Sequence, residues 1–306
     1  MSRLIWVCAL ALLACGCVTA APVCVPGDGV TLQVLGSGGP IADDARAATA
    51  YVIWIDGRSR LLVDAGSGTF LRMGQAGAAF DDLDFVALSH LHTDHSADLP
   101  ALLKSGVFSK RSRALGISGP SAGGPFPGLN HFLDRLIGKD GAYAYLSSYL
   151  HGTSDSVRLE PVELDVGSKD VMAVYADAAS GIRIDALSVP HGIVPAMAYR
   201  ISIGDQVLVF ASDQNGNNEA FADFARDADL LTMHMVVPEG VTGAGRALHA
   251  PPALIGKIAA DAGVSKLVLS HFMARSLKDL PGNVAAVKKS YGGPVVEASD
   301  LACIVP

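Results

Sequence analysis

The stretch Leu83-Asp-Phe-Val-Ala-Leu-Ser-His90-Leu-His92-Thr-Asp94-His95 decides the fold. Its apolar half reads as a buried strand, and its polar half places three imidazoles and one carboxylate within six residues. In an extended segment His90 and His92 point the same way, because the side-chain period is two. If the chain then turns into a helix, Asp94 and His95 project to the neighbouring side. One short segment can therefore ligate two metal ions about 3.5–4 Å apart.

The residue types in this segment indicate which metals it would bind. Imidazole and carboxylate ligands suit zinc, and they also suit manganese or iron. The alternative is a chance cluster on a solvated loop. With nine histidines in 306 residues, three within six positions is improbable by chance. The sequence therefore predicts two divalent ions, expected to be zinc.

The composition of the whole chain limits the class of protein. Half of the 306 residues are hydrophobic, which is enough for a substantial core. The formal net charge is −7, and non-specific nucleic-acid binding usually needs a basic patch. A small anionic substrate is still compatible, because a metal pair supplies its own positive charge. We therefore expect a small-molecule ester substrate and no nucleic acid.

Strand patterns dominate each half of the chain, with helical patterns between them. The expected strands cover 30–35, 50–55, 60–64, 85–88, 114–118, 171–176, 182–187, 197–203, 206–210, 230–234 and 266–269. The expected helices cover 70–77, 97–105, 129–137, 219–226 and 253–262. This order suits an α/β fold, an αββα sandwich of two mixed sheets with outer helices. We expect a single domain over 21–306, with an insertion around 119–150 on the substrate side.

Residues 1–20 read as an export signal. Arg3 is a short positive region, an apolar stretch follows over 4–14, and Ala20 ends a small-residue cleavage site. A membrane anchor is the alternative, but a span needs about 20 apolar residues. A second alternative is a lipoprotein box ending at Cys15, which would place a lipid on that cysteine. The protein is thus expected in the periplasm or anchored to the cell envelope.

Cysteine usage fits an exported protein. Cleavage after Ala20 would leave Cys24 near one end and Cys303 near the other. Domain termini often lie close together, and oxidising compartments allow disulfides. We hypothesise a Cys24–Cys303 bridge; the alternative is two unpaired buried thiols.

The histidine cluster resembles the His-x-His-x-Asp-His signature of the metallo-β-lactamase superfamily. The segment from Leu61 to Gly66 is similar to the family's strand that ends in Asp-x-Gly. The resemblance implies that Asp64 supports the metal loop by hydrogen bonding and is not a ligand. The alternative for Asp64 is a turn former before Gly66.

The resemblance also implies the remaining ligands, each at the end of an expected strand. His191 follows Val189-Pro, Asp213 follows 209–212, and His271 follows 267–270. Each of these residues is weak evidence alone, because a lone histidine at a strand end is more often structural. Because they follow the order that the family uses, they complete a set of seven expected metal ligands. The first metal takes His90, His92 and His191, the second takes Asp94, His95 and His271, and Asp213 bridges them.

Within the superfamily the chain is most similar to ribonuclease Z and its relatives, which include phosphodiesterases and arylsulfatases. Gly36-Ser-Gly-Gly39 followed by Arg46 resembles that branch's opening loop. His249 matches a histidine thought to act on the scissile phosphate. Two departures stand out: Met235 follows His234 where the branch usually has a glutamate, and no lysine- and glycine-rich arm is present. The likeness therefore implies phosphoester chemistry without transfer RNA as substrate.

The expected function is metal-assisted hydrolysis of a phosphodiester or sulfate ester, in which a hydroxide held between the metals attacks. Asp94 and His249 are the expected catalytic residues. Hydrolysis of a β-lactam or a lactone is the alternative, although Asp213 separates this chain from most true β-lactamases. An alternative of another class is a non-catalytic metal-binding protein. A homodimer is left open, because no interface is readable.

Overall fold

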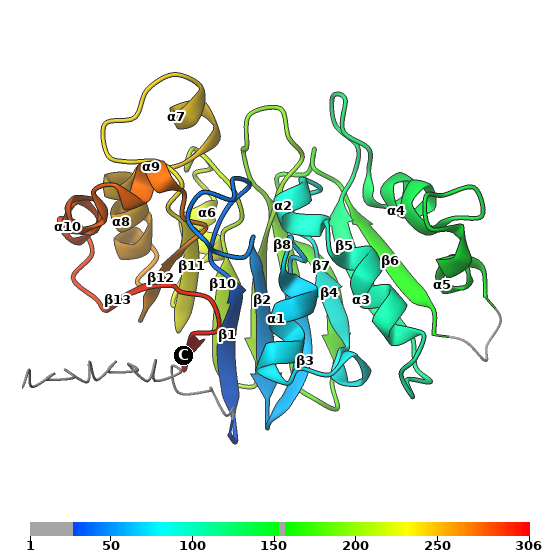
Figure 1. Cartoon of the computed structure of the whole chain (residues 1–306). Coiled ribbons are helices and arrows are strands. Elements are labelled where there is room, and N and C mark those ends of the chain that lie inside the picture. The colour runs from blue at the N-terminus through cyan, green and yellow to red at the C-terminus, as the bar shows by residue number, and fades with distance from the viewer. Residues whose placement is uncertain (1–26, 153–156) are drawn as a thin grey trace, which may run out of the picture.

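Two seven-stranded mixed sheets pack face to face in the computed structural model, with helices on their outer faces (Figure 1). The structure describes residues 27–152 and 157–306. The expected export signal and Cys24 lie outside the described residues. The expected αββα sandwich is confirmed.

The first sheet contains both the first and the last strand of the described chain, β1 and β14. Its order is β14-β1-β2-β3-β4-β5-β6. The strands are β1 (Val30–Gly36), β2 (Ala50–Ile55), β3 (Arg58–Val63), β4 (Phe85–Ala87), β5 (Leu115–Pro120), β6 (Leu159–Leu164) and β14 (Cys303–Ile304). β14 pairs with β1, and Cys303 in it is disulfide-bonded.

The second sheet carries the later strands in the order β13-β12-β11-β10-β9-β8-β7. They are β7 (Met172–Asp177), β8 (Ile182–Ser188), β9 (Met197–Ile203), β10 (Gln206–Phe210), β11 (Leu230–His234), β12 (Leu267–Ser270) and β13 (Val295–Glu297). The first four are antiparallel, and β10 to β13 are parallel. The carboxyl ends of the parallel strands therefore meet at one edge.

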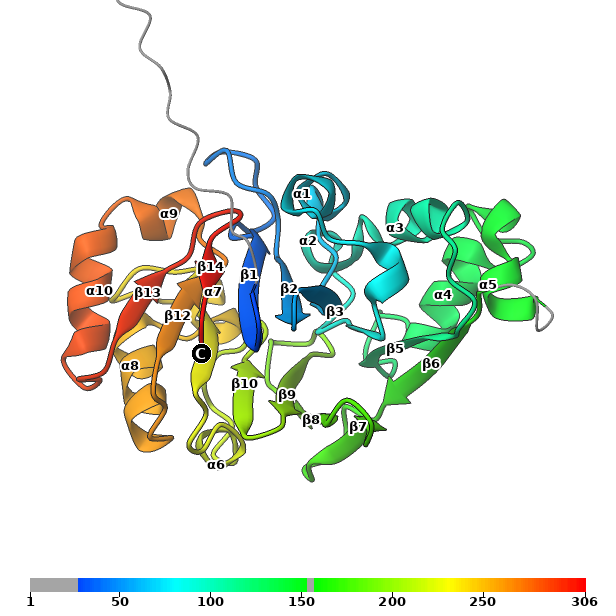
Figure 2. The same cartoon turned by 90° about the horizontal axis from the view of Figure 1, so that it is seen from below.

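Helices cover the two outer faces (Figure 2). α1 (Thr69–Ala76), α3 (Leu99–Gly106) and α4 (Leu129–Ile137) pack on the first sheet, and α6 (Phe221–Phe224), α8 (Pro252–Asp261) and α10 (Leu280–Lys288) on the second. The other helices are η1 (Phe80–Asp82), α2 (Thr93–Ser96), η2 (Ala144–Leu146), α5 (Ser148–His151), α7 (Ala244–Leu248) and α9 (Ala274–Leu277). Among the described helices, none combines the length and apolar character that a membrane span requires.

β2 shows why a strand covered on both faces is apolar throughout. Its six residues are all buried. Tyr51 and Ile53 belong to the core between the sheets, whereas Val52 and Trp54 belong to the core under the helices. Because successive side chains point to opposite faces, a strand covered on both sides must be apolar at every position.

Local signals placed most elements correctly. The turn between β2 and β3 has positive φ at Asp56 (49°) and Gly57 (72°), as the expected hairpin requires. The helix expected over 219–226 is shorter, spanning only Phe221–Phe224, and Asp227 just beyond it has a left-handed φ of 54°. β6 was not predicted, because Pro161 and its polar neighbours resemble a loop; it lies at a sheet edge, where proline is tolerated.

The segment 119–150, expected as an insertion over the site, is divided in the structure. Phe126 in its first loop lies against the His92 ring, with centroids 5.7 Å apart. α4, in contrast, contacts β5 and β6. Tyr149 is buried and donates a hydrogen bond to the Leu103 carbonyl. The first loop therefore reaches the histidine cluster, and the rest covers the first sheet.

Candidate metal centre

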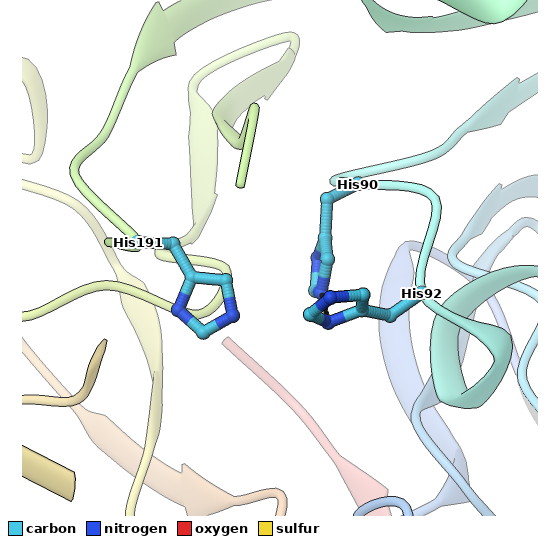
Figure 3. Close-up of side chains that lie close together, drawn as sticks. All are labelled: His90, His92 and His191. Atoms are coloured by element: carbon cyan, nitrogen blue, oxygen red, sulfur yellow. Dashed lines mark hydrogen bonds between the residues drawn. The ribbon is translucent and has the colours of Figure 1, made fainter. Parts of the chain in front are cut away.

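The histidine cluster lies at one edge of the sandwich, where strands of both sheets end. His90, His92 and α2 follow β4 of the first sheet, and α2 lies near the upper ends of the strands in Figure 1. His191 follows β8, and His271 follows β12, both of the second sheet. Figure 3 shows His191 facing His90 and His92 from the opposite segment. Segments far apart in the chain thus bring their imidazoles together.

The three residues expected at the first metal form one group. His90, His92 and His191 offer ligand atoms that all lie within 4.8 Å of one another. His90 Nε2 is 3.0 Å from His92 Nδ1, and the His191 ring is centred 5.2 Å from that of His90. His92 is half-buried, whereas His90 and His191 are buried.

The residues expected at the second metal form another group, and all three are buried. Asp94, His95 and His271 also lie within the same 4.8 Å limit. His95 Nε2 is 3.1 Å from His271 Nε2, and His271 Nε2 is 3.3 Å from Asp94 Oδ2. Both imidazoles therefore direct the same nitrogen towards one carboxylate oxygen.

Asp213 lies between the two groups. Its Oδ2 is 3.7 Å from His191 Nε2 and 4.0 Å from His95 Nε2. Its Oδ1 is 3.4 Å from His271 Nε2. One carboxylate thus faces imidazoles of both triads, which is the arrangement expected of a bridging ligand.

The chemistry of these donors fits a pair of divalent ions. His95 Nδ1 is 2.8 Å from Asp64 Oδ2, and His191 Nδ1 is 3.0 Å from the Leu248 carbonyl. Because those oxygens accept, each Nδ1 carries a proton and each Nε2 points inwards, where it can bind a metal once it is unprotonated. His271 Nδ1 is buried and has no hydrogen-bond partner among the described residues. Imidazole nitrogens and carboxylate oxygens that converge in a buried space are what a cation would satisfy.

Asp64 is held as the sequence predicted. It is buried, and its carboxylate accepts from the Ser89 amide (2.7 Å) and the Ser89 hydroxyl (2.9 Å) in addition to His95. A buried carboxylate needs such partners. The residue therefore supports the metal loop from behind.

The electrostatics keep the carboxylates ionised. Burial alone would raise the pKa of Asp213, but the imidazoles around it, His271 first, hold that pKa well below its ordinary value. For Asp94, burial also acts upwards, and the hydrogen bond with His271 brings the pKa to about 2. Burial lowers the pKa of His90 well below its usual range. These three side chains are thus in the protonation states that metal ligands need. Burial acts to lower the pKa of His95, but the nearby carboxylates, Asp64 first, raise it to about 9, so a metal ion would displace the proton on Nε2.

Two close approaches explain glycines near the centre. A Cβ on Gly66 would lie 2.1 Å from the Asp94 carbonyl oxygen, and one on Gly39 would lie 2.7 Å from His271 Cε1. The backbone is also strained at Asp64 (φ 60°) and at His271 (φ 53°). Strain of this kind gathers at functional sites, where the surroundings enforce it.

His249 lines the same cavity as the two triads. The cavity has a volume of about 520 Å³, and Leu91, Val236 and Met273 contribute apolar walls. His249 is buried, and its Nδ1 is 3.9 Å from Asp213 Oδ2 and has no hydrogen-bond partner among the described residues. The residue after His234 is Met235, where the similar branch usually has a glutamate, and its side chain cannot hydrogen-bond an imidazole strongly.

His234 is a member of the centre that the sequence placed only at a strand end. It is buried, and its Nδ1 is 2.7 Å from Asp213 Oδ1. The parallel pairing of β11 with β12 sets His234 opposite Ser270, next to His271. That register was a usable signal, since both strands were predicted and neighbouring strands end at the same edge.

Comparisons with known proteins show what the chain is similar to. A family model described as the metallo-beta-lactamase superfamily matches residues 43–253. Ribonuclease Z of Thermobifida fusca is 27% identical over 297 residues, which cover 88% of this chain and 92% of the relative.

Two solved structures are similar in fold. The metallo-beta-lactamase fold protein YhfI from Bacillus subtilis has a TM-score of 0.70 and 23% identity, covering 90% of this chain and 99% of its own. The short form of human tRNase Z has a TM-score of 0.66 and 18% identity, covering 90% and 98%. At these identities the likeness concerns the fold.

Proposed function

The chain belongs to the metallo-beta-lactamase superfamily and is a metal-dependent hydrolase, and we propose that it cleaves small phosphodiesters with two divalent ions, most simply zinc. The observation that carries the proposal is Asp213, whose carboxylate lies between two triads of ligands. The relative named ribonuclease Z supports phosphodiester chemistry over β-lactam hydrolysis.

The chain's own residues divide the work. His90, His92 and His191 would hold one ion, Asp94, His95 and His271 the other, and Asp213 both. When bound, the two ions would supply positive charge and allow water to ionise near neutral pH. His249 lies at the cavity wall, where its ring N–H can stabilise charge that develops on the phosphoryl or leaving oxygen.

The size and charge of the cavity support a small substrate. Arg275 is the only lysine or arginine among the described residues that line it. Tight binding of nucleic acid usually neutralises several phosphates with basic side chains. The name ribonuclease Z nevertheless points to RNA for the relative, against the expectation that this chain has no nucleic-acid partner. RNA therefore belongs among the substrates to be tested.

The test is a turnover assay with four substrates. The purified protein, loaded with zinc or manganese, is offered bis(p-nitrophenyl) phosphate, p-nitrophenyl sulfate, a chromogenic β-lactam and a precursor transfer RNA. We expect chelator-sensitive turnover of the phosphodiester and little of the others. Asp213→Asn is the matched control, because it keeps the side-chain shape and removes the charge.

Other outcomes of the four-substrate assay would change the proposed function. Preference for the β-lactam would overturn the phosphodiester assignment, and preference for the transfer RNA would overturn the small substrate. Preference for the sulfate would move the reaction to sulfate esters at the same centre. A metal-loaded protein without turnover would favour a non-catalytic metal-binding role.

We also propose that the protein acts outside the cytoplasm. The support is the sequence of residues 1–20 and the disulfide at Cys303. The mass of the protein purified from cell envelopes tests this. Cleavage before Ala21 indicates a soluble exported form, and a lipid-modified N-terminal Cys15 indicates an anchored one. An intact N-terminus would overturn the proposal.

A further inference from the structure

A buried pair of side chains lies directly behind Asp213. His234 ends β11 in the second sheet, and Tyr51 lies in β2 of the first. The Tyr51 hydroxyl is 3.2 Å from His234 Nε2, and the His234 Nδ1 is 2.7 Å from Asp213 Oδ1. Tyr51 is 1% exposed and His234 5% exposed, so solvent does not replace these contacts.

The direction of the hydrogen bonds follows from the groups involved. An ionised carboxylate only accepts, so His234 donates from Nδ1 to Asp213. A neutral imidazole then has Nε2 free to accept, and the Tyr51 hydroxyl donates to it. Each group therefore sets the orientation of the next.

The consequence for Asp213 is a fixed orientation of its carboxylate. Oδ1 accepts from His234 and lies 3.4 Å from His271 Nε2 of one triad, whereas Oδ2 lies 3.7 Å from His191 Nε2 of the other. We infer that Tyr51 and His234 are positioning residues, which hold the Asp213 carboxylate in the orientation that faces both triads. This inference rests on the two-metal function proposed above.

Metal affinity provides a readout besides activity. Residues behind the ligands typically contribute 10–100-fold to metal affinity. For His234→Leu, we expect the affinity for zinc to fall by about 10–100-fold. His234→Asn keeps an N–H near the position of Nδ1 and should recover most of that loss. Tyr51→Phe should lower the affinity less than His234→Leu does, because the imidazole remains.

Tyr199→Phe is the matched control. Tyr199 is also fully buried, and its hydroxyl donates to the Leu88 carbonyl at 2.9 Å. Both tyrosine variants lose one buried hydroxyl, but only Tyr51 contacts His234. Thermal unfolding, followed by circular dichroism, would show that each variant folds.

The experiment titrates each full-length variant with zinc under chelator competition, counts bound ions, and records the visible spectrum with cobalt in place of zinc. A changed cobalt spectrum in Tyr51→Phe and an unchanged one in Tyr199→Phe support the positioning role of Tyr51 and His234. Wild-type affinities in His234→Leu, or identical behaviour of the two tyrosine variants, overturn it. Loss of an ion in both His234 variants with Tyr51→Phe unaffected would make His234 a ligand, which also overturns it. Fewer than two ions in the wild type overturns the two-metal function itself.

Discussion

The two triads differ in how firmly their side chains are held. Asp94, His95 and His271 are all buried, and Asp64 fixes the ring of His95 from behind. The other triad has no carboxylate of its own, and His92 is half-buried beside Phe126. Fixed ligands and a negative charge raise affinity for a cation. We therefore expect the carboxylate-containing triad to bind its metal more tightly, and the His92 side to admit substrate.

Removal of Asp213 should have the largest effect, because it is the residue that both triads share. For Asp213→Ala we expect turnover to fall by at least about 10³-fold, which is roughly 4 kcal/mol of barrier. Metal content should fall at both triads. Turnover and bound zinc are measured on the same samples, with His131→Ala on the exposed surface as control. Two tightly bound ions in Asp213→Ala would show that it does not bridge.

A pair of ligand variants tests the contrast directly. His271→Ala should remove the tightly bound ion, and His92→Ala the weakly bound one. The loss should exceed about 100-fold in affinity, since ligands contribute more than the groups behind them. Zinc titration should therefore show only the weaker site in His271→Ala and only the tighter site in His92→Ala. Loss of the same class in both would contradict the ranking of the triads.

His249→Ala tests the residue that contacts neither triad through a hydrogen bond. We expect turnover to fall by about 100-fold, the lower end of what a positioned acid or base contributes. Two zinc ions should remain bound, because six ligands and Asp213 are intact. Loss of zinc in this variant would make His249 a ligand, consistent with its 3.9 Å distance from Asp213.

Asp64→Asn would sharpen the comparison by loosening only one triad. The amide has the shape of the carboxylate but half its acceptors, so the His95 ring loses its fixed partner. Affinity for the tightly bound ion should fall by about 10–100-fold. The weaker site should be unchanged in the same titration. A larger effect at the weaker site would mean that Asp64 acts on the whole loop.

The smallest effect is expected from Arg246→Ala, on the α7 side of the cavity. The Arg246 guanidinium donates to the Asn215 carbonyl at 2.8 Å and so fastens the segment that carries Leu248 and His249. Losing this bond should cost about 1 kcal/mol of stability. Turnover should fall by less than about 10-fold, a change of under 1.4 kcal/mol in the barrier. Unfolding by urea and the turnover assay measure the two quantities.

Several features of the site were predictable because they are local. The spacing of His90, His92, Asp94 and His95 is a property of one strand end and one helical turn. The hairpin at Asp56 depends only on which residues tolerate positive φ. Segments without such signals were missed, as with α10, whose start contains proline and glycine. The export signal and the domain boundaries stay predictions.

The sequence by itself determined the kind of chemistry, because residue types and short spacings specify which donors stand together within a few positions. It predicted the sandwich through the order of strand and helix patterns along the chain. Only the tertiary structure decided that Tyr51 and His234, 183 positions apart, meet behind Asp213. That contact depends on how two sheets pack and where their strands end, and no periodicity along the chain records the distance between sheets.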